Sequence, residues 1–221
     1  MVDAKEVAVS ILAECDSLPV QNASTMRAVR KKYSSLLKES QGDFVIQIAR
    51  ELKQTGRFRW IGYELILANK AAFKCLDAGE AEELGQGINS WWTVDSFART
   101  ISGPAWLAGL IPDELILKWA NSPEHWWRRA ALVSTVALNV RSHGGMGDVP
   151  RTLQICRLLV GDKQDMVVKA MSWALRELVV HDPQAVEAFL DEHEKVLAGR
   201  VKREVRNKLK SGLKNPKGVK K

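Results

Sequence analysis

Residues 22–37, NASTMRAVRKKYSSLL, carry the pattern that decides the fold of this chain. Their apolar side chains recur at the spacing of one face of an α-helix. Asn22 and Ser24 are residue types that cap a helix N-terminus, so they predict where the helix begins. We therefore expect a helix over residues 24–40 that buries one face. The side chains of that face are Met26, Val29, Tyr33, Leu36 and Leu37.

The same helical period continues along nearly the whole chain, and no run alternates long enough to predict a strand. The predicted helices cover residues 3–16, 24–40, 43–54, 57–76, 80–86, 91–101, 113–121, 123–140, 149–161, 164–181, 183–192 and 194–210. Glycine and proline predict the breaks between them, because a residue before proline resists the helical conformation. These breaks are Gly56, Gly79, Gly103-Pro104, Ile111-Pro112, Ser122-Pro123, residues 143–145 and Asp182-Pro183. At one of them, Ser122 is expected to cap a helix with Pro123 in its first turn.

About a dozen short helices joined by short links predict an all-α array of stacked helix pairs, a solenoid with a concave face. No fixed period is evident, so the repeats are degenerate, and a globular helix bundle is the alternative. We expect one helical domain over residues 1–210. Residues 211–221, SGLKNPKGVKK, are expected to form a basic, disordered tail.

The positive charge is concentrated near the C-terminus. The net charge is +7, yet residues 195–221 alone carry eleven Lys or Arg and one acid, so the rest of the chain is net negative. A smaller basic cluster comprises Arg27, Arg30, Lys31, Lys32 and Lys38. Clusters of this kind suit a polyanion such as nucleic acid, but an anionic membrane surface or simple solubility explains them almost as well.

Several classes of protein are not indicated by the sequence. The three cysteines, Cys15, Cys75 and Cys156, are odd in number and widely spaced, so neither a disulfide framework nor a metal site is expected. No apolar stretch is long enough for a membrane span, and the first residues do not resemble a signal peptide. We expect a reduced, cytoplasmic protein that needs no metal or other cofactor, associates with the nucleoid when bound to DNA, and acts as a monomer.

Two tryptophan-rich segments carry residues suited to chemistry. In SWWTVD, residues 90–95, Trp91 and Asp95 lie one helical turn apart, which places a carboxylate beside an aromatic plane. The alternative is that one indole packs in the core while Asp95 is solvated. In EHWWRRAA, residues 124–131, Arg128 and Arg129 adjoin two indoles and suit phosphate contacts. The alternative there is an amphipathic helix start with an arginine that reaches solvent.

A third segment, residues 165–177, brackets an indole with cations. Lys169, Trp173 and Arg176 fall on one face of the predicted helix, DMVVKAMSWALRE. Because a packed helix face rarely holds this combination, we expect that face to turn toward a polyanion.

These three segments resemble, in the same order, those of the AlkD-type DNA alkylation-repair glycosylases, a family of HEAT-like repeat proteins. The resemblance rests on WWTVD, WWRRAAL and VVKAMSWALRE, and weaker similarity extends to the segments around Arg27 and Arg203. It spans roughly residues 24–213, and segment 57–64, RFRWIGYE, departs from the family pattern. It implies a HEAT-like solenoid that binds duplex DNA and removes positively charged N3- or N7-alkylated purines.

The resemblance also implies roles for single residues. Asp95 matches the catalytic carboxylate, and Trp91 and Trp173 match the indoles that flank the lesion. One arginine of the Arg128–Arg129 pair matches the active-site arginine, and the sequence leaves open which one. The expected DNA-binding residues are Arg128, Arg129, Lys169, Arg176, Arg27 and Arg203. Trp92 is expected to have a structural role only.

The implied chemistry is physically sound. A purine alkylated at N3 or N7 already carries a positive charge and leaves without being protonated, so the reaction needs a carboxylate to stabilise the cationic sugar. Two other functions remain open. One is a non-catalytic HEAT-like DNA-binding protein. The other is a helical scaffold for a protein partner, which would not need Lys169, Trp173 and Arg176 on one face.

Overall fold

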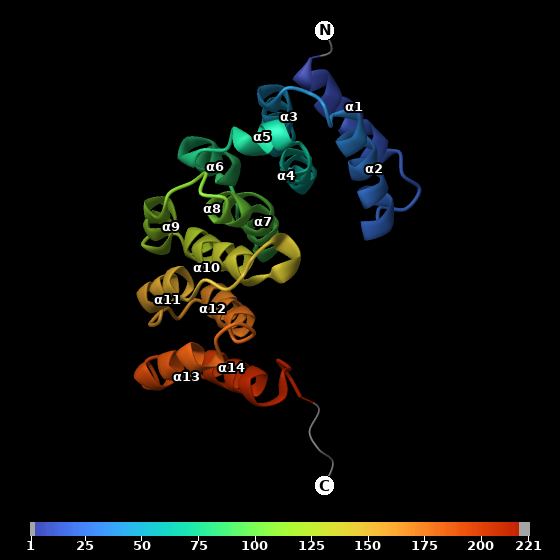
Figure 1. Cartoon of the computed structure of the whole chain (residues 1–221). Coiled ribbons are helices and arrows are strands. Elements are labelled where there is room, and N and C mark those ends of the chain that lie inside the picture. The colour runs from blue at the N-terminus through green and yellow to red at the C-terminus, as the bar shows by residue number, and fades with distance from the viewer. Residues whose placement is uncertain (1–2, 217–221) are drawn as a thin grey trace. The chain divides into compact units, whose positions relative to one another are not determined.

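The computed structural model describes residues 3–216, and within that range every regular element is helical (Figure 1). The prediction of an all-α fold is confirmed. None of these helices is both long and apolar enough to cross a membrane. Five of the eleven residues assigned to the expected tail, 217–221, lie outside the described range.

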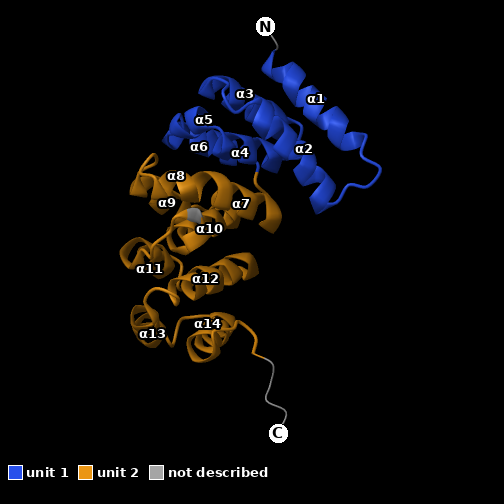
Figure 2. Ribbon diagram, turned by 45° about the vertical axis from the view of Figure 1, so that its right-hand side comes forward, with its two compact units in different colours: residues 1–87 blue, residues 88–221 orange. Residues whose placement is uncertain are grey.

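The chain divides into two compact units, residues up to Gly87 and residues from Ile88 (Figure 2). In the first unit, α3 packs against α1, α4, α5 and α6, and α2 packs against α1 and α4. The bounds in this unit are α1 Ala4–Asp16, α2 Ala23–Leu36, α3 Gly42–Gln54, α4 Arg59–Ala68, α5 Lys70–Lys74 and α6 Ala78–Gly85.

The second unit is a stack of helix pairs, the arrangement of a helical-repeat solenoid. Helices α10, α12 and α14 pack one upon the next, while α9, α11 and α13 each pack against the following helix of that row (Figures 1 and 2). A continuous helical stretch of α7, η1 and α8 packs on α10. The bounds are α7 Trp91–Phe97, η1 Ala98–Ser102, α8 Gly103–Leu107, α9 Asp113–Ala120, α10 His125–Asn139, η2 Arg141–His143, α11 Val149–Leu158, α12 Asp165–Leu178, α13 Pro183–Glu192 and α14 Gly199–Ser211.

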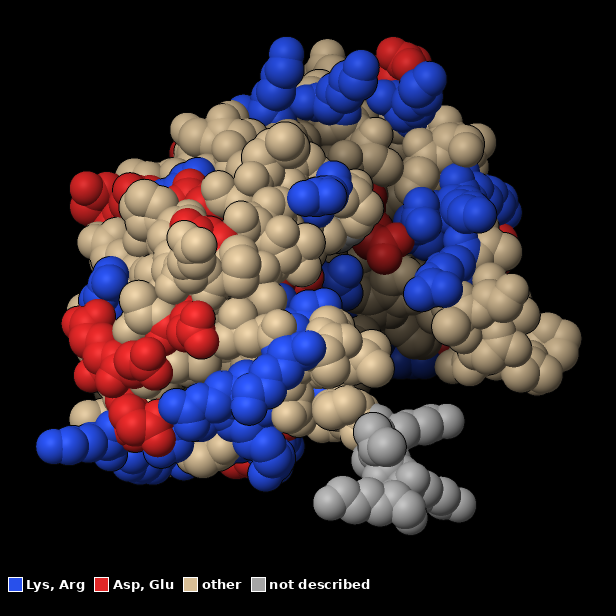
Figure 3. Space-filling view, turned by 60° about the horizontal axis from the view of Figure 1, so that its bottom comes forward, with Lys and Arg blue, Asp and Glu red and all other residues tan. Residues whose placement is uncertain are grey.

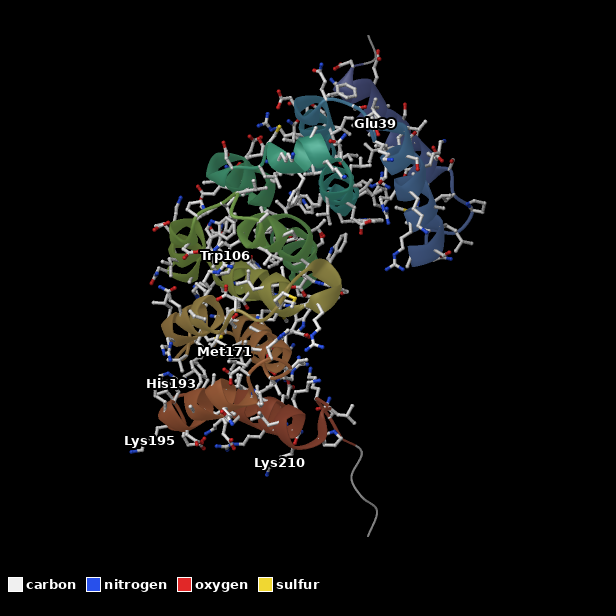
Figure 4. The ribbon with its side chains drawn as sticks, viewed as in Figure 1. Glu39, Trp106, Met171, His193, Lys195 and Lys210 are labelled. Carbon is white, nitrogen blue, oxygen red and sulfur yellow. The ribbon has the colours of Figure 1, made fainter. Side chains whose placement is uncertain are left out.

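Helix α10 is the core of the second unit. Every residue from Arg129 to Asn139 is buried, so this helix is covered on all sides. Beside it, Phe97 and Trp119 pack against Trp127, and Trp106 of α8 and Met171 of α12 are also buried (Figure 4). A helix in this position can bring side chains of several neighbouring helices together. The candidate site is built around α10 for this reason.

Some predicted boundaries are wrong for identifiable reasons. The helix expected over 57–76 ends at Ala68, because the Asn69 side chain caps α5 through the Ala72 amide and donates to the carbonyls of Leu37, Lys38 and Ser40. Gly79 lies inside α6 and breaks nothing. The N-cap of α10 is Glu124, so Pro123 precedes the helix, and α14 begins at Gly199 where a helix from 194 was expected. Asn22 caps α2 as predicted.

The predicted break at Gly103-Pro104 is also wrong. The chain stays helical from Trp91 to Leu107 because η1 is a π-helical turn, in which the Gly103 amide donates to the Ala98 carbonyl. Pro104 has no N–H to donate, and the wider turn accommodates it. Gly103 is required at this point, since a Cβ there would lie 2.7 Å from the Ala137 Cβ atom of α10. This close approach fixes η1, which carries Arg99, against α10.

Candidate active site

Helix α7 places an indole and a carboxylate at its exposed start. Ser90 caps the helix, with its side chain accepting from the Thr93 amide and the Thr93 hydroxyl accepting from the Ser90 amide. Trp91 is therefore the first helical residue, and its side chain is 59% exposed. Asp95 follows one turn later, with a side chain that is only 17% exposed. The alternative of a core indole with a solvated Asp95 is thus wrong on both counts.

Asp95 is held by Arg129 of α10. The Arg129 Nε and Nη2 atoms donate to Oδ1 and Oδ2 of Asp95, and both bonds are 2.9 Å long. The third donor used, Nη1, bonds the carbonyl of Met166 at the start of α12. With its side chain 6% exposed, Arg129 is a buried cross-link between three helices. A bidentate pair of this kind fixes the orientation of the carboxylate.

The environment of Asp95 alters its acidity. Burial raises the pKa of the Asp95 carboxyl above its ordinary value, and the Arg129 hydrogen bonds together with the nearby charge of Arg99 partly offset this effect. A carboxylate in this setting is shielded from water yet remains ion-paired. Its negative charge therefore acts more strongly on a cation that comes close.

Arg128 has a different role in the geometry. Its Nε donates to Asp162 at 2.7 Å, and its Nη1 donates to the carbonyls of Ser122 and Pro123 ahead of α10. These bonds fasten the start of α10. Of the two arginines between which the sequence could not choose, Arg129 is the one at Asp95.

Trp173 of α12 joins the site through Arg99. The Trp173 Nε1 atom donates to Glu177 at 2.9 Å, and the Arg99 guanidinium lies over the indole ring, 5.6 Å from its centroid. Arg99 is exposed and lies one turn after Asp95. The site therefore brings together Asp95, Arg129, Arg99 and Trp173, with Trp91 one turn from the carboxylate.

Sequence reasoning missed Arg99. Its only signal is the spacing of four residues from Asp95, which places the two on one helical face. Within an apolar helix, a single arginine resembles an ordinary solvated residue, so the spacing alone did not single it out.

The two cations predicted beside Trp173 are engaged with protein groups. Lys169 pairs with Asp165 at 2.7 Å. Arg176 donates to the Ser172 hydroxyl, which in turn donates to the buried Glu204 of α14 at 2.6 Å. Burial lowers the pKa of Arg176 below its ordinary value. Contact of Lys169 or Arg176 with DNA remains a prediction.

Two further predicted DNA-binding residues belong to other helices. Arg27 is exposed on α2 in the first unit, and Arg203 is exposed on α14. Lys195 and Lys210 also point away from the second unit (Figure 4), and Figure 3 shows further blue side chains over the α13–α14 end, beside a red acidic group. This end of the chain offers basic side chains, on helices other than α7, which carries Asp95.

The other indoles of the motifs behave differently from expectation. Trp92 was expected to be structural, yet its side chain is 43% exposed. Trp127 is half-buried, lying 4.8 Å from Trp119 between ring centroids, so it belongs to the core and not to a stacking surface.

Among the side chains that the structure describes, no three His, Cys, Asp or Glu residues group closely enough to hold a metal ion. All three cysteines are free, and burial raises the pKa of the Cys156 thiol to about 12. The chemical groups that the candidate site brings together are a carboxylate, guanidinium groups and indoles.

The fold and site define an all-α repeat protein with a buried carboxylate–arginine pair beside tryptophans. The family model described as DNA alkylation repair enzyme matches residues 20–209, and the chain belongs to this family. A search of the curated proteins found no match. The chain accordingly has a role in the repair of alkylated DNA.

Proposed function

We propose that the protein is a DNA glycosylase that releases positively charged N3- and N7-alkylated purines from duplex DNA. The observation that carries this proposal is the bidentate Asp95–Arg129 pair, which holds an oriented carboxylate in a buried position beside Trp173 and Arg99. Membership of the DNA alkylation repair family supports the substrate class.

Asp95 would stabilise the transition state of glycosidic bond cleavage. The bond between C1′ and the purine nitrogen breaks, its electron pair stays with the base, and the cationic base leaves neutral. Positive charge then develops on the sugar, where a fixed carboxylate stabilises it most. A water molecule adds to C1′, and its proton passes to Asp95 and then to solvent.

Trp91 and Trp173 would recognise the charge of the lesion. An indole face attracts a cation, and each such contact contributes about 0.5–2 kcal/mol. The Trp173 ring already has the Arg99 cation over it, so its face accepts positive charge. Undamaged purines lack the charge and gain no such stabilisation.

One observation favours a second function, namely DNA binding without catalysis. The Arg129 guanidinium occupies both carboxylate oxygens of Asp95, and a pair of this kind can serve only to link helices. The two functions differ in whether Asp95 is needed for base release.

The test measures release of 7-methylguanine from methylated duplex DNA by the wild type, Asp95→Asn and Asp162→Asn. Asp162 is a matched control, because it is also a buried partner of an α10 arginine, with a side chain that is 8% exposed. We expect prompt release by the wild type and Asp162→Asn, and a loss of at least about 100-fold in Asp95→Asn with duplex binding retained.

Two results would contradict the proposal. If folded wild-type protein binds methylated duplex but releases no base, DNA binding without catalysis becomes the better account. If Asp95→Asn and Asp162→Asn lose release equally, the effect reflects the packing of α10 and not the chemistry of Asp95.

A further inference from the structure

Arg99 differs from the other cations around the candidate site. Arg128 pairs with Asp162, Arg129 with Asp95, and Lys169 with Asp165. The contacts of Arg99 in the described part of the chain are the face of Trp173 and a longer-range attraction to Asp95. Arg99 is exposed, and these are the only interactions found for its guanidinium among the described side chains.

The position of Arg99 is fixed although its side chain is exposed. It lies in the π-helical turn that Gly103 packs tightly against α10, so its backbone has little freedom. A guanidinium over an aromatic ring keeps its N–H groups at its edge, where they form two parallel bonds to an oxyanion. Preorganisation of this kind lowers the entropy lost when a ligand binds.

We propose that Arg99 binds a backbone phosphate of the DNA next to the lesion; this rests on the proposed function. The same site holds the negative charge of Asp95, which repels the DNA backbone, and a cation within reach of both compensates for it. Arg129 is less suited to this contact, because three of its N–H donors bond Asp95 and the Met166 carbonyl and its side chain is only 6% exposed. The ligand is a phosphodiester, since the guanidinium donors match its oxygens in a bidentate contact.

The first experiment measures binding to a duplex with a stable tetrahydrofuran abasic site, as a function of salt. Each phosphate contact contributes about 0.9 to the slope of log K against log salt concentration. We expect Arg99→Ala to make the slope shallower by about 0.9 and to weaken binding about 10-fold at low salt. Arg99→Lys, which keeps the charge, should restore the slope.

Arg157→Ala is the matched control. Arg157 also lies over an aromatic ring, 6.0 Å from the Phe189 centroid, with a side chain that is 50% exposed, but it belongs to α11. This variant should keep the wild-type slope. Thermal melting of all variants shows whether each is folded.

A second measurement locates the contact. Single neutral methylphosphonates replace the phosphates on either side of the abasic site, one per duplex. We expect one methylphosphonate to weaken binding by the wild type about 10-fold and to leave binding by Arg99→Ala unchanged. Two groups in direct contact show this kind of non-additivity.

The proposal is overturned if Arg99→Ala keeps the wild-type salt slope and if its loss of affinity simply adds to the loss caused by each methylphosphonate. An effect on lesion affinity alone would then mean that Arg99 only positions Trp173. These experiments measure binding and not base release. If the protein releases no base but Arg99→Ala and one methylphosphonate are non-additive, the phosphate contact is upheld and the glycosylase proposal fails.

Discussion

The Asp95 carboxylate on α7 receives two 2.9 Å hydrogen bonds from Arg129 on α10, and the same guanidinium also bonds the first turn of α12. One arginine therefore determines where the candidate catalytic group lies. Its removal would disturb the orientation of Asp95 without touching the substrate. This relationship separates positioning from chemistry and leads to the first prediction.

Arg129→Lys should lower kcat for base release about 10- to 100-fold, since lysine lacks the planar fork that donates two parallel bonds to a carboxylate and so fixes its orientation less well. KM should change less, because Trp91 and Trp173, the indoles proposed to flank the lesion, remain. Initial rates of base release over a range of methylated-duplex concentrations separate kcat from KM, and single-turnover rates show that the loss is in the chemical step. Arg128→Lys is the control on the neighbouring residue, and equal losses in both variants would contradict a specific positioning role.

Activity should fail at a higher pH than an ordinary aspartate would allow. The pKa of Asp95 is raised from 3.8, mainly by burial, so protonation removes its charge as the pH falls through that raised value. The acid limb of kcat/KM should therefore lie above pH 3.8. Base release in Asp95→Asn, measured over the same pH range, gives the background, and a limb at the ordinary value would contradict the prediction.

The raised pKa of Asp95 also determines how this residue affects folding stability as the pH changes. Because the folded-state pKa of Asp95 lies above the unfolded one, the folded state takes up this proton first as the pH is lowered. Asp95 therefore opposes folding most strongly when it is charged, and this opposition decreases as the pH falls through its folded pKa.

Trp173→Ala and Trp91→Ala should each reduce the affinity for duplex with 7-methylguanine by about 2- to 30-fold, the range of one cation–π contact. Affinity for the same duplex with guanine should change much less, since the neutral base lacks the attraction. Asp95→Asn serves as the background, so that the lesion stays intact during titration. Trp92→Ala is the control for loss of an exposed indole, and equal losses for both duplexes would indicate that charge is not recognised.

Gly103→Ala should destabilise the fold by about 1–3 kcal/mol, since the added methyl group would meet the Ala137 Cβ atom and the Ala98 carbonyl at 2.7 Å. Urea denaturation measures the loss. Gly199→Ala is the control at the first residue of α14, where a Cβ meets nothing within 4 Å, and it should be neutral or stabilising by up to about 1 kcal/mol. A stable Gly103→Ala variant would mean that η1 and α10 separate easily.

The sequence predicts the class of fold and the spacing of Trp91 and Asp95, because both depend on local helical period. It does not predict which arginine meets Asp95. Neighbouring residues on a helix point about 100° apart, and only the packing of α10 against α7 and α12 decides which of the two lies between them.

The π-helical turn escapes prediction for a related reason. Gly103-Pro104 looks like a helix end, yet Gly103 is there because α10 lies too close for a side chain, and the wider turn tolerates the proline. Because the sequence does not predict this turn, it gives no reason to single out Arg99 as a functional residue. The turn is thus determined by the packing of α10, which local sequence patterns do not predict.

The cross-link made by Arg129 is entirely intramolecular, and it is complete without DNA. Because these contacts orient the carboxylate within the protein itself, we expect Asp95 to need no reorientation when DNA binds. If the protein is the glycosylase proposed above, discrimination between damaged and normal bases depends on the lesion's own charge in a field that is oriented before DNA binds.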